Sequence, residues 1–486
     1  MPAQFRRTDP ILRISFAAAV IVVATLAAAQ PPETSRPNVV LIVTDDQGYG
    51  DASSYGSTDL QTPNLDRLGR EGVRFTQFRV NPLCAPTRAS LLTGLDSLAT
   101  GMWRGPSEPA RAAAKAKKRG KVTPDEDPDD AAEAGTVRRL HDDLILLPQF
   151  LQRAGYATGA FGKWHLGYEA RNQPNARGFD EFVGFLGGAH PYWLRANSRL
   201  LENGKPLVIE GHTTDVFADR AIAFIRANRA RPFFCYLPFN AVHGPMRSAD
   251  RAADSGKPDW LAHYERRGVP PLRRDYNAVM SHADERIGDV LATLSELGLA
   301  DRTLVICHSD NGGILHTYPS NNGPLRGGKG QTYEGGIRVP AFMRWPGVIP
   351  AGTVSTADAA HYDVFATVLE AAGLPVPERN GRFPVRGVSL LAHVRSAGRT
   401  PLPDRYQFWD LYGQCGALHG RWKLVGVIGN HHGRFDQAAR EAEQTRFALY
   451  DLETDLAEKH DRAAEFPAIY TDLKDRHLAW LRQFVP

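Results

Sequence analysis

Apolar runs and amphipathic segments alternate along this chain. The segment "NVVLIVTDD" is an almost uninterrupted apolar, β-branched run, which is typical of a strand buried on both faces. Helical spacing follows in "LPQFLQRAGY", and then a short strand-like run in "YATGAFGKWH". The succession recurs in "TDVFADRAIAFIRAN" with "PFFCYLPFN", and in "SHADERIGDVLATLSELG" with "RTLVICHSD". Repeated helix and strand predict an α/β fold in which helices flank a mostly parallel sheet.

Two regions depart from this pattern. Residues 105–135 carry basic and then acidic side chains with almost no large apolar ones, which predicts a charged, flexible insertion. A lid or partner-binding arm is the functional alternative for this segment. After about residue 395, "RYQFWDLYG" and "HGRWKLVGVIG" are typical of antiparallel strands, and "PAIYTDLKDRHLAWLRQF" of a final helix. We therefore predict a main domain over 36–395 and a small C-terminal α+β domain over 396–486.

The N-terminus has the pattern of a secretory signal peptide. Arg6, Arg7 and Arg13 precede an apolar run, and "LAAAQ" offers a cleavage site after Ala29. An uncleaved membrane anchor is the alternative, but the apolar run is short for a spanning helix. We therefore predict a signal peptide over residues 1–29. The mature protein is expected to be periplasmic or secreted, with no stable membrane insertion after signal cleavage.

Composition narrows the possible partners and the use of cysteine. The formal charge of +4 over 486 residues gives no reason to expect a nucleic acid partner. Four cysteines in an exported protein could form two disulfides. However, Cys235 and Cys307 lie in strand-like runs, where a free thiol behaves as a small apolar group, and we predict that Cys415 lies in a turn. Cys84, in "NPLCAPTRASLLTG", needs a chemical explanation.

Polar residues follow four of the predicted strands. Because ligands bind outside the carboxyl ends of strands in open α/β sheets, we expect these side chains to converge at one sheet edge. A turn or a helix cap would explain any single pair as well, but all four together favour a site. The residues concerned are Asp45, Asp46, Lys163, His165, His243, Asp310 and Asn311.

The side chains of this set suggest a metal and an anionic substrate. Asp45, Asp46, Asp310 and Asn311 offer hard oxygen donors, which favour calcium or magnesium over zinc. A divalent cation with several cationic side chains around it suits a sulfate or phosphate ester. Cys84 precedes the predicted helix "PTRASLLTG", so backbone N–H groups would also favour an anion there. The cationic side chains expected around the metal are Arg88, Lys163, His165, His243 and Lys329.

The motif "CAPTRASLLTG" resembles the Cys-x-Pro-x-Arg signature of the formylglycine-dependent sulfatases of the arylsulfatase type. "DDQGYGD", "GYATGAFGKWHLG", "SDNGG" and "GPLRGGKGQTYEGGIRVP" resemble the other motifs of that family, in the same order. The resemblance extends from about Pro37 to the C-terminal helix. It implies an alkaline-phosphatase-like fold with a small C-terminal domain, and the activity of a sulfuric ester hydrolase.

The resemblance also explains the isolated cysteine. In this family a maturation enzyme oxidises that cysteine to formylglycine while the chain is unfolded, so Cys84 would be a precursor rather than a nucleophile. The aldehyde hydrates to a diol, and one hydroxyl attacks sulfur and expels the alcohol. The second hydroxyl then loses a proton and expels sulfate, which regenerates the aldehyde. A serine in this position lacks the second hydroxyl and would remain sulfated.

The resemblance implies a role for each candidate residue. The metal ligands would be Asp45, Asp46, Asp310 and Asn311 with the modified Cys84, and we expect Ca²⁺ rather than Mg²⁺. Arg88 would hold the formylglycine hydroxyls, and Lys163 and Lys329 would bind sulfate oxygens. His165 would be the base for elimination. His243 would contact the sulfate and protonate the leaving group.

The substrate is less closely defined by the sequence. A sulfated carbohydrate is favoured over an aryl sulfate, but chondroitin, carrageenan and fucan fragments cannot be separated. A phosphoester or phosphonate hydrolase of the same superfamily and a non-catalytic glycan-binding relative are the alternative functions. Loop residues could contact a sugar, with ordinary packing as the alternative; they are His190, Tyr192, Trp193, His316 and Tyr318.

Overall fold

The computed structural model describes Met1 and residues 36–106, 139–196, 198, 200–244, 255–315, 319–411, 414–427 and 447–484. Residues 2–29 of the predicted signal peptide, residues 107–135 of the predicted insertion, and the loop residues His316 and Tyr318 lie outside this set. Within the described residues, no helix has both the length and the apolar character needed to cross a bilayer.

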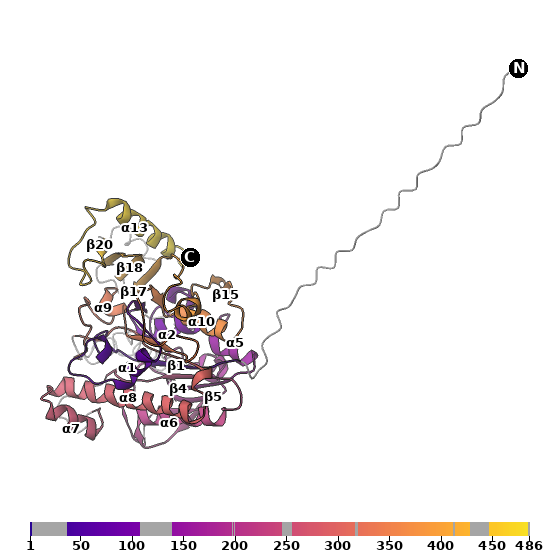
Figure 1. Ribbon diagram of the computed structural model, residues 1–486, viewed down its shortest axis with the longest axis vertical. Helices are drawn as coiled ribbons and strands as arrows, with labels where there is room; N and C mark the ends of the chain where they lie inside the picture. The colour runs from indigo at the N-terminus through magenta and orange to yellow at the C-terminus, as the bar shows by residue number, and fades with distance from the viewer. Residues whose placement is uncertain are drawn as a thin grey trace, which may run out of the picture.

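A ten-stranded sheet forms the centre of the molecule (Figure 1). From one edge to the other its strands are β13 (Thr353–Ser355), β2 (Val73–Phe75), β12 (Ala341–Arg344), β11 (Thr303–Ser309), β1 (Asn38–Thr44), β10 (Phe233–Pro238), β4 (Ala157–Lys163), β5 (Glu181–Phe185), β7 (Leu200–Glu202) and β8 (Lys205–Leu207). The five central strands from β11 to β5 are parallel. Antiparallel pairs join β12 to β11 and to β2 on one side, and β7 to β5 and to β8 on the other. The predicted mostly parallel α/β sheet is confirmed.

Helices cover both faces of this sheet, and alternate residues of β1 pack into the two apolar cores beneath them. Val39 and Leu41 belong to one apolar core, Val40 and Ile42 belong to the other, and all four are fully buried. This two-sided burial explains why the β1 sequence shows no polar alternation. The first core is completed by α2 (Cys84–Thr93), α5 (Leu147–Arg153), α10 (Asp363–Ala371) and α11 (Leu391–Arg395). The second is completed by α1 (Pro63–Arg70), α6 (Thr213–Ala227), α7 (Pro258–Arg266) and α8 (Pro271–Glu296).

The predicted start of α8 was wrong by ten residues. The helical pattern was assigned from residue 281, whereas α8 begins at Pro271. Proline is well tolerated in the first turn of a helix, where its missing N–H would have no partner. The polar residues Asp275 and Asn277 in this first part of the helix are buried, so the sequence there lacks the apolar and polar alternation that predicts an amphipathic helix.

The remaining short elements are β3 (Phe78–Arg79), α3 (Ser97–Thr100), β6 (Trp193–Leu194), β9 (Gly211–His212), α9 (Glu334–Ile337), β14 (Ala359–Ala360), β15 (Arg379–Asn380) and β16 (Phe383–Pro384), with 3-10 turns at Ser53–Tyr55, Ala170–Asn172, Pro174–Arg177 and Ala300–Arg302.

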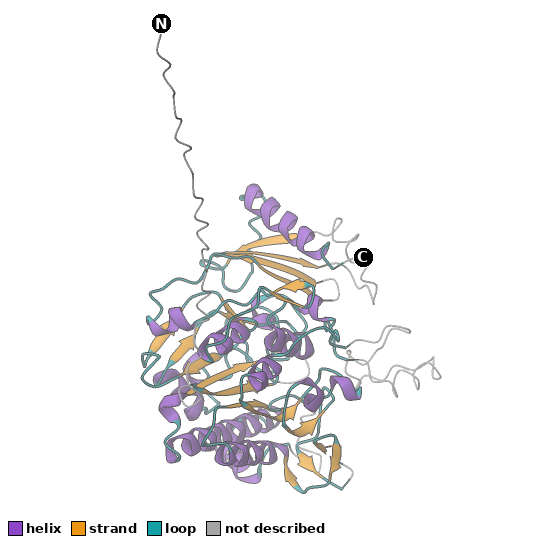
Figure 2. Ribbon diagram, turned by 90° about the vertical axis from the view of Figure 1, so that its right-hand side faces the viewer, coloured by secondary structure: helices purple, strands orange, loops and turns teal. Residues whose placement is uncertain are grey.

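A second, four-stranded sheet with one helix across it forms the C-terminal part (Figure 2). Its antiparallel strands, in spatial order, are β17 (Gln407–Leu411), β18 (Gln414–His419), β19 (Trp422–Val427) and β20 (Phe447–Asp451), and the helix is α13 (Pro467–Leu481). This confirms the predicted small α+β part, while the boundary at 395/396 stays a prediction.

The environment predicted for Cys415 was wrong, because this residue lies in β18 and not in a turn. The flanking glycine suggested a turn, but a Cβ at Gly416 would lie only 3.3 Å from the Trp409 side chain. The glycine therefore serves close packing between neighbouring strands. Cys235 and Cys307 are buried and free, as expected from the sequence, and Cys84 and Cys415 are buried and free as well.

Candidate active site

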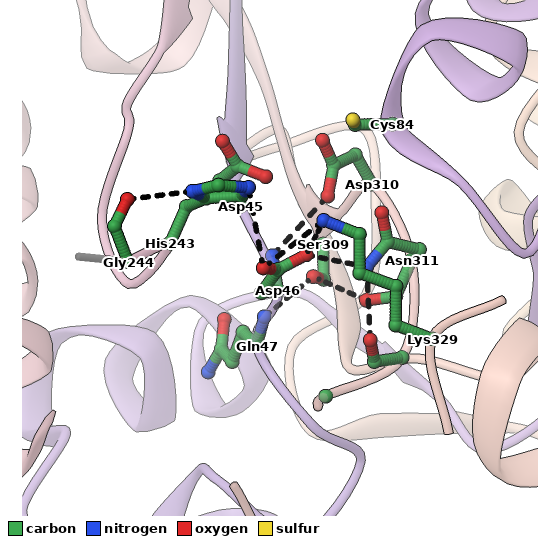
Figure 3. A network of polar contacts seen from close by, with 12 residues as sticks. Asp45, Asp46, Gln47, Cys84, His243, Gly244, Ser309, Asp310, Asn311 and Lys329 are labelled. Carbon is green, nitrogen blue, oxygen red and sulfur yellow. Dashed lines mark hydrogen bonds and ion pairs between the residues drawn. The ribbon is translucent and has the colours of Figure 1, made fainter. Parts of the chain in front are cut away.

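The carboxyl ends of neighbouring strands bring the predicted polar residues together (Figure 3). In the register of β1 and β11, Thr44 lies opposite Ser309, so the acidic residues that follow the two strands are neighbours. The Asp310 N–H donates to Thr44 O over 3.0 Å. Lys163 is the last residue of β4, and His243 follows β10. Four separate segments thus reach one edge of the sheet, as the pattern predicted.

Two residues of the site have a left-handed backbone. Asp46 has φ of 63° and His165 has φ of 61°, a conformation that few residues other than glycine adopt. The Asp46 N–H donates to Asp310 Oδ1 over 3.3 Å. The turn after β1 is therefore held by its contact with the turn after β11.

Each of the three carboxylates has a cationic partner. Lys163 Nζ donates to Asp45 Oδ2 over 2.7 Å, and Arg88 Nη2 donates to Asp310 Oδ2 over 2.7 Å. Lys329 Nζ lies 2.9 Å from Asp46 Oδ1. All three carboxylates are almost completely buried. Opposite charges at these distances favour ionised side chains, and the arrangement places two lysines and one arginine beside the acidic cluster.

The oxygen atoms of the cluster suit a hard divalent cation. Asp45 Oδ1 and Asn311 Oδ1 are buried and have no hydrogen-bond partner, which is uncommon for polar atoms inside a protein. Possible ligand atoms of Asp45, Asp46 and His243 lie within 4.8 Å of one another, and the same holds for Asp45, Cys84 and Asp310. Carboxylate and amide oxygens are the donors that calcium and magnesium prefer. The residues present therefore fit the predicted metal.

The acidic side chains differ strongly in proton affinity. Burial and the neighbouring Asp310 carboxylate raise the pKa of Asp45 to about 8. Burial also opposes ionisation of Asp46, but Lys329 and His243 outweigh it and lower its pKa to about 2. Carboxylates that share a site cannot all ionise at low cost. A bound divalent cation would remove this conflict.

Cys84 is the first residue of α2 and is 1% exposed. Its Sγ lies 3.3 Å from His165 Nδ1. Burial raises the pKa of the thiol to about 12, so Cys84 is not a thiolate at neutral pH. Because the thiolate is the nucleophilic form of cysteine, unmodified Cys84 is poorly suited to attack a substrate.

Both candidate histidines are neutral at pH 7 in this environment. Burial and the nearby Lys163 hold the pKa of His165 well below its usual value. Burial and Lys329 lower the pKa of His243 to about 4. His243 Nδ1 is 2.7 Å from Gly244 O, and its Nε2 is 3.7 Å from Asp46 Oδ2. The Nδ1 contact requires a proton on that nitrogen, which leaves the Nε2 lone pair directed towards the acidic cluster.

Of the three sugar-contact candidates that the structure describes, two are packed inside the protein. The packing alternative holds for Tyr192, which is 2% exposed and whose hydroxyl donates to His243 O over 2.8 Å, with Asn240 O also within hydrogen-bond distance. Its phenol is needed inside, where it fixes the backbone that carries His243. His190 is also buried, with Nδ1 2.7 Å from Pro191 O, whereas Trp193 is half-buried in β6.

Sequence reasoning missed the contribution of Ser309 to the site. Its hydroxyl accepts from the Gln47 N–H over 3.0 Å and donates to Asn311 O over 2.9 Å. This residue therefore joins the two turns that carry the acidic residues. Its position directly before Asp310 in "SDNGG" was a signal that could have identified it.

Comparison with known proteins identifies the family. Residues 37–374 match the Sulfatase family. The N-acetylgalactosamine-6-sulfatase of Rattus norvegicus is 34% identical over 373 residues, which are 72% of this chain and 64% of the rat protein. The Homo sapiens protein of the same name is 33% identical over 419 residues, 82% of this chain and 71% of the human one. The chain thus spans about two thirds of the length of these relatives.

Solved structures agree with this result. The crystal structure of Ps i-CgsB in complex with k-i-k-neocarrahexaose has a TM-score of 0.75 and 29% identity, covering 92% of this chain and 93% of the other. The phosphonate monoester hydrolase SpPMH from Silicibacter pomeroyi, with a TM-score of 0.62 and 20% identity over 92% of this chain and 95% of its own, shares the fold. By the sequence matches, together with the motifs, the chain belongs to the sulfatase family.

Proposed function

We propose that this protein is an exported sulfatase that hydrolyses sulfate esters of carbohydrates, using formylglycine made from Cys84 and a bound calcium ion. The observation that carries this proposal is the position of Cys84. It begins α2, lies 3.3 Å from His165 and has Asp45 and Asp310 within reach of a shared cation. A buried thiol with a pKa of about 12 has little use there unless it is converted into another group.

Formylglycine and the calcium ion would supply complementary chemistry. Formylglycine offers a hydrated aldehyde for covalent catalysis, and the cation offers charge stabilisation next to it. Asp45, Asp46, Asp310 and Asn311 would hold the cation with the modified residue 84. All-oxygen donors suit the flexible coordination of calcium slightly better than the strict octahedron of magnesium.

The cationic side chains would then bind and orient the sulfate ester. Lys163 and Lys329 already lie beside the carboxylates that would bind the cation, so their ammonium groups are placed to contact sulfate oxygens. Arg88 contacts Asp310 and the Lys163 carbonyl, and this rigid attachment would orient it towards the group formed at residue 84. These roles for Lys163, Lys329 and Arg88 follow from a preorganised positive site around a developing negative charge.

The two histidines would move the protons. His165 is neutral, and its Nδ1 faces Sγ of Cys84. It can therefore accept a proton from the group formed at residue 84. His243 has its Nε2 directed towards Asp46. A sulfate ester bound between His243 and Lys329 would raise the pKa of this imidazole, because its negative charge opposes the effect of the lysine. His243 could then protonate the leaving alcohol.

Carbohydrate is the substrate class that the relatives favour. The mammalian relatives are named for a sulfated amino sugar, and the solved structure of Ps i-CgsB holds a neocarrahexaose. Sulfated glycans are extracellular polymers, which agrees with the signal peptide predicted over residues 1–29 and a periplasmic or secreted location. A formylglycine-generating maturation enzyme would be the second partner.

Mass spectrometry of the tryptic peptide from Val80 to Arg88 tests the proposed modification. We expect the Cys84 side chain –CH₂–SH to be replaced by –CH=O, with a mass decrease equal to the loss of one sulfur and two hydrogens and the gain of one oxygen. An unmodified thiol in fully active enzyme would overturn the proposal. The Cys235 peptide from the same digest is the internal control, and its thiol should remain intact.

Substrate assays separate the remaining functions. We expect faster turnover of a chromogenic sulfate ester than of the matching phosphate ester, and release of sulfate from a panel of sulfated oligosaccharides. A preference for phosphate or phosphonate esters would favour the hydrolase represented by SpPMH. Binding of oligosaccharide without sulfate release would favour a non-catalytic glycan-binding protein.

A further inference from the structure

Three possible metal ligands meet in the C-terminal part, on the face of the sheet that α13 covers. Asp410 of β17 and Cys415 of β18 are directly opposite each other in the strand register. His477 comes from α13. Ligand atoms of the three residues lie within 4.8 Å of one another, and Cys415 Sγ is 3.3 Å from Asp410 Oδ2. Three separate elements therefore place a thiol, a carboxyl and an imidazole together.

His477 is fully buried, and neither of its ring nitrogens makes a hydrogen bond of standard geometry, although the Gly416 backbone lies near enough to favour the protonated ring. Aromatic rings of Phe408, Phe447 and Trp480 surround it at centroid distances of 6.1, 6.1 and 5.5 Å. Leaving a buried polar group unsatisfied costs about 1–3 kcal/mol. Burial lowers the pKa of His477 to about 3, against a weaker effect of the Gly416 backbone. The imidazole is therefore neutral, and one nitrogen has a lone pair available for a ligand.

We propose that Asp410, Cys415 and His477 bind a transition-metal ion, with Zn²⁺ as the preferred metal. Zinc is bound by cysteine sulfur, histidine nitrogen and carboxylate oxygen at 2.0–2.3 Å in tetrahedral geometry. Ligand atoms no more than 4.8 Å apart can reach such a geometry with small side-chain movements. The mixed soft and borderline donors differ from the all-oxygen cluster of the active site, which selects calcium or magnesium. The fourth position would be filled by water.

Binding is coupled to release of a proton. Burial and the nearby Asp410 raise the pKa of the Cys415 thiol well above its usual value. As the Zn–S bond forms, the S–H bond breaks and the proton leaves to solvent, so uptake should be stronger at higher pH. The bound ion would join β17 and β18 to α13, because each ligand comes from a different one of these elements. The ion would thereby stabilise the C-terminal sheet and helix.

Elemental analysis and cobalt spectroscopy on the full mature chain test this site. The Cys84→Ala background removes the only thiol of the active site cluster, so that any sulfur ligand must come from elsewhere. After dialysis against zinc, we expect one zinc per chain. After exchange with Co²⁺, we expect a thiolate-to-cobalt charge-transfer absorption in the near ultraviolet.

Two further variants assign the signal to these residues. Cys415→Ala should abolish the absorption and weaken zinc binding by about tenfold or more, and His477→Gln should weaken zinc binding to a similar extent. Cys235→Ala, which removes a buried thiol of β10, should leave both signals unchanged. Should the first two variants fail to fold, the measurement on the Cys84→Ala protein decides. Absence of both stoichiometric zinc and the cobalt absorption in that protein would overturn the proposal. It would mean that the three groups form a cluster that binds no metal.

Discussion

Lys423 Nζ lies 2.9 Å from Glu334 Oε1, and both side chains are fully buried. Lys423 belongs to β19 of the C-terminal sheet, whereas Glu334 begins α9 next to the large sheet. Lys423 Nζ is also 2.9 Å from Glu458 Oε1, and Arg79 Nη2 is 2.9 Å from Glu334 Oε2. Glu334 lies at the C-terminal end of the loop segment that carries Lys329. The C-terminal sheet therefore helps to hold the segment from which Lys329 reaches Asp46.

We expect Lys423→Met to destabilise the protein by about 3–5 kcal/mol, because removing one member of a buried ion network leaves the others unpaired. Glu334 and Glu458 would both lose a partner at 2.9 Å. Chemical denaturation measures the change. The exposed Lys459 provides a matched control, since Lys459→Met should change stability by no more than about 0.5 kcal/mol. Equal stability of the two variants would contradict the importance of this network.

Removal of the metal should lower both activity and stability. A ligand that binds only the folded state stabilises it by about 2.7 kcal/mol at a hundred times its dissociation constant. We therefore expect a chelator to lower Tm and sulfatase activity together, and Ca²⁺ to restore both. Full activity of a chelated protein in which elemental analysis detects no metal would contradict the proposed cation site.

Asp310→Asn should weaken this metal binding without preventing folding. The variant keeps an oxygen donor but loses the charge that contacts Arg88 and would contact the proposed cation. We expect a larger calcium concentration to be needed to reach the same Tm. Asp301→Asn changes an exposed residue and should leave the calcium dependence unchanged. A calcium dependence that is the same in both variants would remove Asp310 from the ligand set.

The effect of calcium should depend on pH through Asp45. Its pKa is about 8 in the folded, metal-free protein, against a usual value of 3.8. Protonated Asp45 contributes to the free energy of unfolding of the metal-free protein. This contribution is complete below pH 3.8 and is lost as the pH rises through 8. Calcium must displace this proton, so its affinity should rise about tenfold per pH unit below that point. The calcium-induced increase in Tm should therefore be larger at neutral than at acidic pH.

Thermal unfolding with and without calcium across this pH range provides the measurement. Burial also raises the pKa of Asp284 to about 7, although the Asn64 and Leu65 backbone N–H groups oppose this. Asp284 belongs to α8, and its carboxylate accepts from N–H groups at the start of α1 rather than facing the cation cluster. Its titration therefore affects both forms equally and cancels in the difference. A calcium-induced shift that does not change with pH would mean that Asp45 is already ionised in the metal-free protein.

The central strands could be predicted because a strand that is buried on both faces has a continuous run of apolar residues. The carboxyl ends of β1, β4, β10 and β11 could then be placed together from the parallel topology alone. This reasoning grouped Asp45 with Asp310 and Lys163, although they are far apart in the chain. It could not give pairing distances, because these depend on register and on side-chain packing.

Short and tertiary-dependent features could not be predicted in the same way. Strands β6 and β9 have two residues each, too few for a period to be recognised. Sugar contact and ordinary packing could not be distinguished for Tyr192 from the sequence, because only the fold places its hydroxyl against the backbone near His243. The sequence did not group Cys415 with Asp410 and His477, because only strand pairing and helix docking bring these residues together.

The predicted charged insertion can be tested by shortening it. The chain segments on either side of it meet, since the His141 N–H donates to Thr100 O over 3.1 Å. A Cβ at Gly101 would lie 2.7 Å from Arg139 O, so these segments are closely packed before residue 107 and after residue 138. A short Gly/Ser linker in place of residues 107–135 would therefore join two segments that already lie side by side at Thr100 and His141.

We expect this replacement to change the free energy of unfolding by no more than about 1 kcal/mol, because the entropy of loop closure varies slowly with loop length. Activity on a small aryl sulfate should persist, since the active-site residues come from strand ends and loops outside the insertion. Tm and kcat/KM for an aryl sulfate and a sulfated oligosaccharide provide the measurements. Equal retention of both activities would show that the insertion is dispensable. Loss of activity on the oligosaccharide alone would make it a substrate-binding arm, and loss on the aryl sulfate would contradict the separation of insertion and catalytic site.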